Sequence, residues 1–502
     1  MRRALAWPVA LLAGVAHTFS FAPFELWWLQ LVALAVLASL VADAGVWRAA
    51  VLGWLFGVGW LVSGLWWLYI SMHDFGGMPS WLAALAVFAL AGLLALYYAA
   101  ALALFARCRR GRPDAPFANA LIWAACWLLA ELARGVCFTG FPWIASGYAH
   151  AVGPLAGWAP WVGVYGISAL AAAVAWMLAA ILRPGGRPEL RMSLGLGALI
   201  VLMMAAPLAL PSRFTQPAGT LSVSLLQPNI AQNLKFDPAL MDGHLRALVR
   251  QIGAARGTLV VTPESVIPFT RGELSGAYWD GLARPFEDTR RALLIGVFLG
   301  NAEEGYVNSV VGISGGSATA GGEYHYGKRH LLPFGEFVPP GFRWFVDLMQ
   351  IPLGDQAHGQ SSAPFDVGGQ RLRPLICFED LFGEGVVASV VGARPATMFV
   401  NVSNLAWFGP RLVQDQHLQF SQMRALEFER PVIRSTNTGA TAVVDHHGRV
   451  TARLPPLVEG TLDAEVEGRT GETPYARWLA AAGLWPLAIV AVALLLVLRR
   501  RR

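Results

Sequence analysis

The chain has 502 residues, of which 55% are apolar and only 14% are charged. Ordinary soluble proteins carry about 25% charged residues, so this composition excludes a purely soluble globular protein. It also excludes intrinsic disorder, because 20 Trp and 26 Phe residues can bury far more apolar surface than an unstructured chain carries. We therefore expect a membrane protein with an additional folded part.

The net charge of +6 is unevenly distributed along the chain. Residues 211–475 hold 22 of the 38 basic and 26 of the 32 acidic residues, so this segment is net acidic. The positive excess belongs to the hydrophobic remainder, where Arg residues between apolar runs are typical of membrane topology. We therefore expect a lipid bilayer as partner and no nucleic acid.

Long apolar runs predict about eight membrane spans, each near the ~20 residues that a helix needs to cross a bilayer. They lie at 4–20, 26–43, 49–70, 81–106, 118–136, 159–182, 191–210 and 477–498. The first two runs are marginal in length. The first run follows Arg2 and Arg3 but lacks a convincing signal-peptide cleavage site, so we expect it to be retained.

The distribution of Arg between the runs predicts the orientation. With a cytoplasmic N-terminus, the short segments that carry Arg beside the spans face the cytoplasm, at 2–3, 48, 107–112, 183–191 and 499–502. The opposite loops at 21–25, 71–80 and 138–158 contain no Lys or Arg. Residues 1–210 then form a bundle of about seven helices, and 211–475 form an extracytoplasmic domain. Residues 476–502 supply the final span and a cytoplasmic Arg tail, so both termini lie in the cytoplasm.

Within 211–475 the pattern changes to short apolar runs bounded by Gly, Pro and Asn, which is typical of strands and turns. Predicted strands lie at Leu221–Gln227, Leu259–Thr262, Ala292–Leu299, Leu372–Phe378, Thr397–Val402 and Thr441–Val444. Helical stretches lie between several of them, at Ala239–Ala255 and Gln414–Glu429. The fold class is therefore a helical transmembrane bundle plus an external α/β domain.

Three side chains in this domain form a set suited to covalent catalysis. Cys377 is the one cysteine of the segment and follows an apolar strand, and Glu264 follows another. Only two of the 38 basic residues are lysines, Lys235 and Lys328, so a lysine is expected where arginine cannot substitute. Cys377, Glu264 and Lys328 could act as nucleophile, base and oxyanion-stabilising cation in acyl transfer. Each could also be structural, since a buried cysteine behaves as a small hydrophobe.

Several motifs resemble those of a known family. Thr262-Pro-Glu-Ser, the segment Tyr326–Pro339 and Ile376-Cys-Phe-Glu resemble the three signature motifs of the nitrilase superfamily. The Pro-Phe-Gly-Glu-Phe-Val-Pro stretch at 333–339 and three further motifs are similar to those of the apolipoprotein N-acyltransferases. Those motifs are Gln227-Pro-Asn-Ile, Asn401-Val-Ser-Asn and Arg434-Ser-Thr-Asn-Thr-Gly.

The resemblance implies an αββα nitrilase-like sandwich with Glu264 as general base, Lys328 as oxyanion stabiliser and Cys377 as nucleophile. It implies supporting or substrate-binding positions at Glu336, Phe378, Glu379, Phe236, Asn308 and Ser403. Three positions depart from the usual family pattern. Phe236 occupies a position where a Trp is usual, Phe378 one where a Tyr is common, and Leu405 one where an Asp is expected. The aromatic changes keep a ring and lose a polar group, and the Leu405 change puts one loop hydrogen bond in doubt.

The implied reaction takes place at the outer face of a bacterial inner membrane. Cys377 would accept an acyl chain from a phospholipid as a thioester, and the N-terminal cysteine amine of a diacylated lipoprotein would then accept that chain. No cofactor or metal is implied. The apolar segment Leu331–Phe345 could form a membrane-facing lid or a loop tucked into the domain core.

Other functions remain possible from the residues alone. The triad also suits a membrane-anchored amidase that hydrolyses a small C–N compound. A transporter would need ionisable groups inside the spans, and the candidates are His17, Glu131 and Arg134, of which the last two could simply pair. A Cys–His dyad with His325, His330 or His417 is a further alternative. His446 and His447 are adjacent, which is unsuited to two metal ligands on one helix face.

Overall fold

The structure is a computed structural model that describes residues 5–109, 115–182, 189–211, 213–287, 289–314, 323–339, 341–344, 355–360, 363–410 and 412–500. The chain divides into two compact units. One comprises Met1–Tyr69, Ser80–Arg213 and Arg477–Arg502, and the other comprises Ile70–Pro79 and Phe214–Ala476. The short segment 70–79 therefore belongs with the sheet domain, although it lies between two apolar helices in the sequence.

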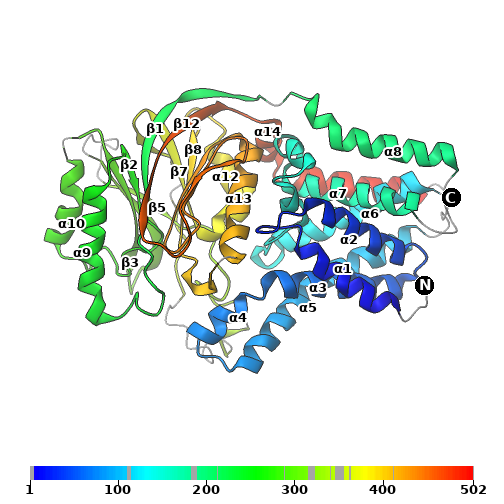
Figure 1. Cartoon of the computed structure of the whole chain (residues 1–502), viewed down its shortest axis with the longest axis horizontal. Helices are drawn as coiled ribbons and strands as arrows, with labels where there is room; N and C mark the ends of the chain where they lie inside the picture. The colour runs from blue at the N-terminus through cyan, green and yellow to red at the C-terminus, as the bar shows by residue number, and fades with distance from the viewer. Residues whose placement is uncertain are drawn as a thin grey trace. The chain divides into compact units, whose positions relative to one another are not determined.

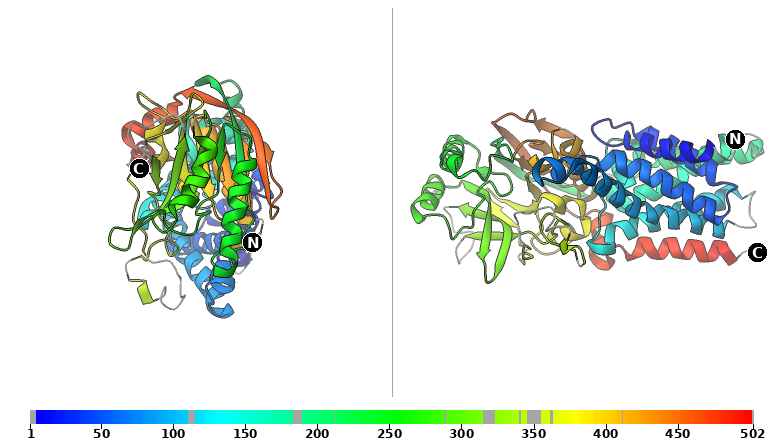
Figure 2. Two further views of the ribbon diagram at one scale, coloured as in Figure 1. Left: turned by 90° about the vertical axis from the view of Figure 1, so that its left-hand side faces the viewer. Right: turned by 90° about the horizontal axis from the view of Figure 1, so that it is seen from below.

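The first unit is a bundle of apolar helices that lie side by side (Figure 2). Its helices are α1 (Ala6–Thr18), α2 (Trp27–Val41), α3 (Val46–Leu65), α5 (Ser80–Cys108), α6 (Pro116–Val136), α7 (Ala159–Leu182), α8 (Leu190–Ala205), most of α14 (Pro474–Ala482), and α15 (Trp485–Arg500). The three-residue helix α4 (Leu68–Ile70) follows α3. In both figures, α1 begins and α15 ends at the same end of this bundle (Figures 1 and 2).

Five helical segments in the described residues are long and apolar enough to cross a membrane, or six if α14 and α15 form one broken span. The run at 477–498, expected as a span, lies on α14 and α15, which are bent by 86° at a break. Gly483 at that break has φ 57°, a left-handed conformation that ends α14. Helices α1 and α2 have 13 and 15 residues, shorter than a usual span. The count of eight stays a prediction.

A buried ion pair lies inside the bundle, on α6. Arg134 Nη2 donates to Glu131 Oε2 at 3.1 Å, and both side chains are fully buried. Glu131 Oε1 also accepts from the Ser146 hydroxyl at 2.7 Å, and Arg134 Nη1 donates to the carbonyl oxygens of Phe141 and Trp143. These bonds tie residues 141–146 to α6. Glu131 and Arg134 therefore pair with each other, which favours a structural function for them over a transport path.

The second unit contains two six-stranded mixed sheets. The first has the order β12-β1-β2-β3-β4-β5 and the second has the order β11-β10-β9-β8-β7-β6. The strands are β1 (Thr215–Gln227), β2 (Leu259–Val261), β3 (Ala292–Asn301), β4 (Gly305–Ser314), β5 (Tyr324–Gly327), β6 (Phe365–Val367), β7 (Gln370–Ile376), β8 (Met398–Ser403), β9 (Val432–Thr436), β10 (Ala442–Val444), β11 (Val450–Arg453) and β12 (Gly460–Gly471). The central strands of both sheets, β1-β2-β3 and β7-β8-β9, are parallel.

Helices cover the outer faces of the two sheets (Figure 1). Helices α9 (Pro238–Ala254) and α10 (Gly276–Ala283) lie beyond the first sheet, and α12 (Gly383–Val386) and α13 (Leu412–Phe428) lie beyond the second. The sheets face each other, and the Ser435 hydroxyl on β9 donates to the carbonyl oxygens of Leu226 and Val261 in the first sheet. The prediction of an α/β sheet domain is confirmed.

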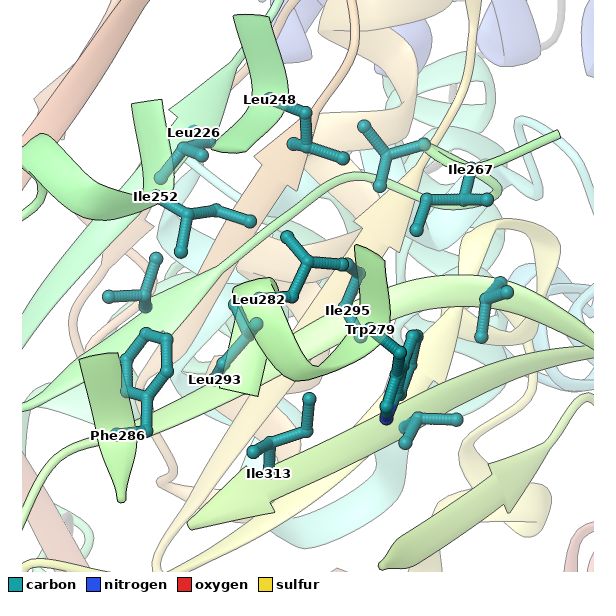
Figure 3. Packing of buried hydrophobic residues seen from close by; sticks show 14 of the residues in the cluster. Leu226, Leu248, Ile252, Ile267, Trp279, Leu282, Phe286, Leu293, Ile295 and Ile313 are labelled. Atoms are coloured by element: carbon teal, nitrogen blue, oxygen red, sulfur yellow. The ribbon is translucent and has the colours of Figure 1, made fainter. Parts of the chain in front are cut away.

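The apolar core between the first sheet and its helices explains why these elements form (Figure 3). Leu248 and Ile252 lie one turn apart on α9, and Trp279 and Leu282 are three residues apart on α10, so each pair shares one helix face. They pack against Leu293 and other buried side chains of the strands. Each predicted strand is present with shifted ends. The strand expected to run to Phe378 stops at Ile376, because Cys377 adopts φ 51° and leaves the extended conformation.

We expect Leu293→Ala to lower the free energy of unfolding of the sheet domain by about 2–5 kcal/mol, because it leaves a cavity at a fully buried position. Leu240→Ala on the exposed side of α9 is the matched control and should change it by less than about 0.5 kcal/mol. Denaturant unfolding of the purified protein in detergent measures both. Equal effects of the two substitutions would contradict the assignment of this core.

Candidate active site

All three residues of the predicted triad lie within three residues of the end of a strand. Glu264 lies three residues after β2, Lys328 follows β5, and Cys377 follows β7. All three side chains are buried. The carboxyl ends of strands are where α/β sheets commonly place their ligands. The fold therefore brings together three residues that are up to 113 positions apart in the sequence.

Lys328 lies between two carboxylates. Its Nζ atom is 2.7 Å from Glu336 Oε1 and 3.4 Å from Glu264 Oε1. Asn308 Nδ2 donates to the same two oxygens, at 2.7 Å to Glu264 and 3.1 Å to Glu336. Burial disfavours the charged form of Lys328, but Glu336 and Glu264 outweigh it and raise the pKa of the ammonium above its usual value. Lys328 is therefore a permanent cation at neutral pH.

The second oxygen of each carboxylate is bound by the backbone. Glu264 Oε2 accepts from the Asn404 N–H at 2.9 Å, and Glu336 Oε2 accepts from the Leu332 N–H at 2.8 Å. Each carboxylate thus has hydrogen-bond donors on both oxygens. An ionised carboxylate can remain buried when hydrogen bonds of this kind replace its contacts with water.

The Cys377 thiol lies within the electrostatic reach of this cluster. Burial and the nearby Glu264 carboxylate raise the pKa of the thiol well above its usual value, and the Lys328 ammonium opposes this shift. The resting side chain is therefore a neutral thiol at pH 7. It needs a base to become a nucleophile, since the thiolate is the reactive form. Glu264 is the carboxylate that fits this requirement.

Glu379 organises the turn that carries Cys377. Its carboxylate accepts from the Tyr326 hydroxyl at 2.8 and 3.0 Å, from the Ile376 N–H at 2.8 Å and from the Arg329 N–H at 2.8 Å. One buried side chain thus ties the end of β7 to the residue after Lys328. Glu379, predicted as a supporting position, thus holds the segments that carry Cys377 and Lys328 together.

His417 cannot act as the base of a Cys–His dyad. Its Nδ1 atom is 2.7 Å from Arg434 Nη2, and a guanidinium can only donate, so Nδ1 is an acceptor. Burial and the Arg434 charge hold the pKa of His417 well below its usual value. The buried Asp380 carboxylate in turn pairs with Arg434 Nη1 at 2.9 Å. The imidazole is therefore neutral, and it accepts a hydrogen bond from Arg434, which also pairs with Asp380.

Of the other predicted supporting residues, Asn308 lies in the cluster around Lys328. Ser403 donates to the side chain of Asn401 at 2.6 Å. Asn401 Nδ2 in turn donates to the Cys377 carbonyl at 3.3 Å. Phe378 is buried against Phe382, with ring centroids 5.2 Å apart. Phe236, by contrast, is 44% exposed.

Sequence reasoning missed Tyr326, Asn401 and Asn404 as site residues. All three lie in motifs quoted above. The contact of Asn404 with Glu264 could not be predicted from the residue type, because its donor is a backbone N–H. Leu405, the position of the expected Asp, is buried with 1% exposure. The adjacent Asn404 side chain still donates to Gln232 Oε1 at 2.9 Å, so this loop keeps a hydrogen bond without an Asp.

The segment proposed as a lid is described at 331–339 and 341–344, and Phe345 lies outside the described residues. Leu331 is buried, whereas Phe342 and Trp344 are 43% and 66% exposed. Its N-terminal part is thus anchored in the domain and its far end presents apolar rings outward. Among the described residues, no group of three or more His, Cys, Asp and Glu side chains is arranged to hold a metal ion.

Comparison with known proteins identifies the family of this chain. The family model for the apolipoprotein N-acyltransferase N-terminal domain matches residues 13–177, and the carbon-nitrogen hydrolase model matches residues 222–475. An apolipoprotein N-acyltransferase of Ralstonia nicotianae is 46% identical over 499 residues, covering 99% of this chain and 94% of that protein. The chain belongs to the apolipoprotein N-acyltransferase family.

A second apolipoprotein N-acyltransferase, from Verminephrobacter eiseniae, is 48% identical over 514 residues and covers 96% of this chain and 94% of that protein. Among solved structures, a CN-hydrolase superfamily protein from Xanthomonas campestris aligns with 53% of this chain and 96% of its own, at 18% identity and a TM-score of 0.38. The two family models and the two relatives confirm the family resemblance read from the motifs, along both parts of the chain.

We expect Lys328→Met to lower the free energy of unfolding by about 3–5 kcal/mol, because it leaves two buried carboxylates without their cation. The double variant Lys328→Met/Glu336→Met should be more stable than Lys328→Met alone, since it removes one of the unpaired charges. Denaturant unfolding in detergent measures both. A Lys328→Met variant as stable as the native protein would contradict the ion cluster.

Proposed function

We propose that the chain transfers an acyl chain from a phospholipid to the N-terminal cysteine amine of a diacylated lipoprotein, through a thioester on Cys377. The observation that carries this proposal is the buried Glu264–Lys328–Glu336 cluster beside a neutral thiol. A base, a cation and a nucleophile are the parts that a double-displacement acyl transfer requires. Membership of the apolipoprotein N-acyltransferase family supports the choice of donor and acceptor.

In the first step, Glu264 receives the proton of the Cys377 thiol as sulfur attacks the ester carbonyl of the phospholipid. Negative charge develops on the carbonyl oxygen, and the Lys328 ammonium stabilises it. The C–O bond to glycerol then breaks, and Glu264 returns the proton to the leaving alkoxide. The products are a lysophospholipid and an acyl thioester on Cys377.

In the second step, the neutral α-amine of the lipoprotein cysteine attacks the thioester carbonyl. Lys328 again faces the developing oxyanion, and Glu264 receives a proton from the attacking nitrogen. The C–S bond breaks, and the sulfur regains a proton from Glu264. The products are an amide on the lipoprotein and the free Cys377 thiol, so the site is ready for a further cycle.

The supporting residues act on these three groups. Glu336 binds Lys328, and Asn308 binds Glu264, so both side chains are fixed in position. Glu379 fixes the turn that carries Cys377. Ser403 orients Asn401, which binds the Cys377 carbonyl. Phe378 packs beside the nucleophile, and the exposed Phe236 ring is suited to contact with an acyl chain.

We assign the protein to the bacterial inner membrane, with eight crossings and the sheet domain on the periplasmic side. Five long apolar helices, the broken pair α14–α15 and the shorter α1 and α2 support this count. The Arg-bearing segments support the orientation, and the bundle ends shared by α1 and α15 fit two cytoplasmic termini. The domain limits 1–210, 211–475 and 476–502 follow from the same arrangement.

The anchored amidase is the less favoured alternative, since the N-terminal match to the acyltransferase family covers helices that an amidase does not need. The two functions differ in whether loss of the acyl group from the enzyme requires an amine acceptor. A thioester preformed from phospholipid should persist without an amine and discharge when a diacylated peptide with a free N-terminal cysteine is added, as followed by intact mass.

The same peptide with an acetylated amine should leave the thioester intact, because an amide nitrogen is a poor nucleophile. Cys377→Ala is the control and should carry no acyl adduct at any time. Rapid loss of the adduct without any peptide would favour the amidase, and an adduct on Cys377→Ala would place the nucleophile elsewhere.

A further inference from the structure

The second lysine of the chain has no part in the mechanism above. Lys235 lies in the loop between β1 and α9 and is only 4% exposed. Its ammonium donates to the Ser265 hydroxyl at 2.9 Å, and within the described residues this hydroxyl is the one hydrogen-bond acceptor that it reaches. Ser265 is the residue directly after Glu264. A buried cation is therefore bound to the neighbour of the proposed base.

The turn that carries Glu264 has little freedom to move. Ser265 adopts a left-handed conformation with φ 44°, which is unfavourable for a serine. Gly296 on β3 lies directly against this turn, since a Cβ atom at Gly296 would be 2.3 Å from the Pro263 oxygen and 2.7 Å from the Ser265 nitrogen. A strained conformation of this kind persists only where surrounding contacts hold it. The Lys235–Ser265 bond is one such contact.

The loop that carries Lys235 is itself anchored near the site. The Ile230 N–H donates to Asn437 Oδ1 at 2.9 Å, and Gln232 Oε1 accepts from Asn404 Nδ2 at 2.9 Å. Asn404 is the residue whose N–H binds Glu264 Oε2. Lys235 and Glu264 are therefore held by one connected set of hydrogen bonds.

The charges of the cluster give Lys235 a second effect. Lys328 faces two carboxylates, so these three groups together carry one excess negative charge. Burial lowers the pKa of Lys235 to about 8, while Glu264 opposes this shift, so Lys235 is mostly protonated at pH 7. Its positive charge balances this excess, and the Glu264 charge in turn favours the protonated lysine.

A lysine fits this position better than an arginine. The ammonium is compact and meets one hydroxyl, whereas a guanidinium would bring five N–H donors into the same buried space. Lys235 and Lys328 are the two lysines of a chain with 36 arginines, and both lie at this site.

We propose that Lys235 is a positioning residue for Glu264: through the Ser265 hydroxyl it fixes the turn that carries the base, and its charge balances the second carboxylate of the cluster. This inference rests on the proposed thioester mechanism, in which Glu264 takes the thiol proton. It assigns to Lys235 an effect on acylation of Cys377 rather than contact with substrate.

The test compares Lys235→Met, Ser265→Ala and the double variant with the native protein. The single-turnover rate of Cys377 acylation is measured by intact mass, in detergent micelles containing phosphatidylethanolamine, between pH 5 and pH 9. Arg246→Met, which removes an exposed positive charge from α9, is the matched control. Thermal unfolding of each variant gives its folded fraction.

We expect Lys235→Met to slow acylation on the order of 10²-fold per folded molecule, as misplacement of a catalytic group does. The native acylation rate should fall as the pH rises through about 8, where Lys235 loses its proton, and this fall should be absent in Lys235→Met. Lys328, Glu336 and Cys377, the other titratable groups facing Glu264, are unchanged in these variants. Ser265→Ala should slow acylation less, and the double variant no more than Lys235→Met, because both act through one contact.

A native rate in folded Lys235→Met, or a fall of its rate near pH 8 like that of the native protein, would overturn the inference, as would additive losses in the double variant. If Lys235→Met does not fold, Ser265→Ala decides, and a native rate there contradicts the inference. Absence of an acyl adduct on the native protein would instead overturn the proposed function, and this inference with it. Arg246→Met should match the native rate in every case.

Discussion

The site depends on one buried ammonium held between two carboxylates. Lys328 is 1% exposed and reaches Glu336 and Glu264 at the same time. Removing charges from water costs several kcal/mol for each ion, so this arrangement is stable only if every member is in place. The ends of β2 and β5, the loop that carries Glu336 and the Asn404 backbone must therefore all converge. The two-sheet architecture is the framework that makes them do so.

In the proposed mechanism, the same cluster lets a deeply buried cysteine act as the nucleophile. Burial alone stabilises the neutral thiol, and the carboxylate of Glu264 adds to that effect. In the proposed mechanism, the thiol stays neutral until a substrate carbonyl is present and its proton passes to Glu264. Glu264 then becomes neutral while negative charge develops on the carbonyl oxygen, so the net charge of the site does not change during attack.

The sequence predicted those features that depend on local pattern. Cys377 and Glu264 were identified because each follows a short apolar run, and Lys328 because lysine is rare in this chain. Contacts between distant segments could not be foreseen in this way. The Tyr326–Glu379 bond joins residues 53 positions apart, and the Asn404 N–H reaches Glu264 across 140 positions. The bend between α14 and α15 was also missed, because hydropathy is the same in a straight and a broken apolar helix.

The most direct test of the account is a count of lysophospholipid released by the native protein without any amine acceptor. A mechanism in which Cys377 keeps the acyl chain predicts a rapid burst of about one lysophospholipid per enzyme molecule, followed by a halt. Addition of an acceptor peptide should restart release at the rate of amide formation. Continuous release without an acceptor, or no release until the acceptor is present, would contradict a stable thioester formed beside the Glu264–Lys328–Glu336 cluster.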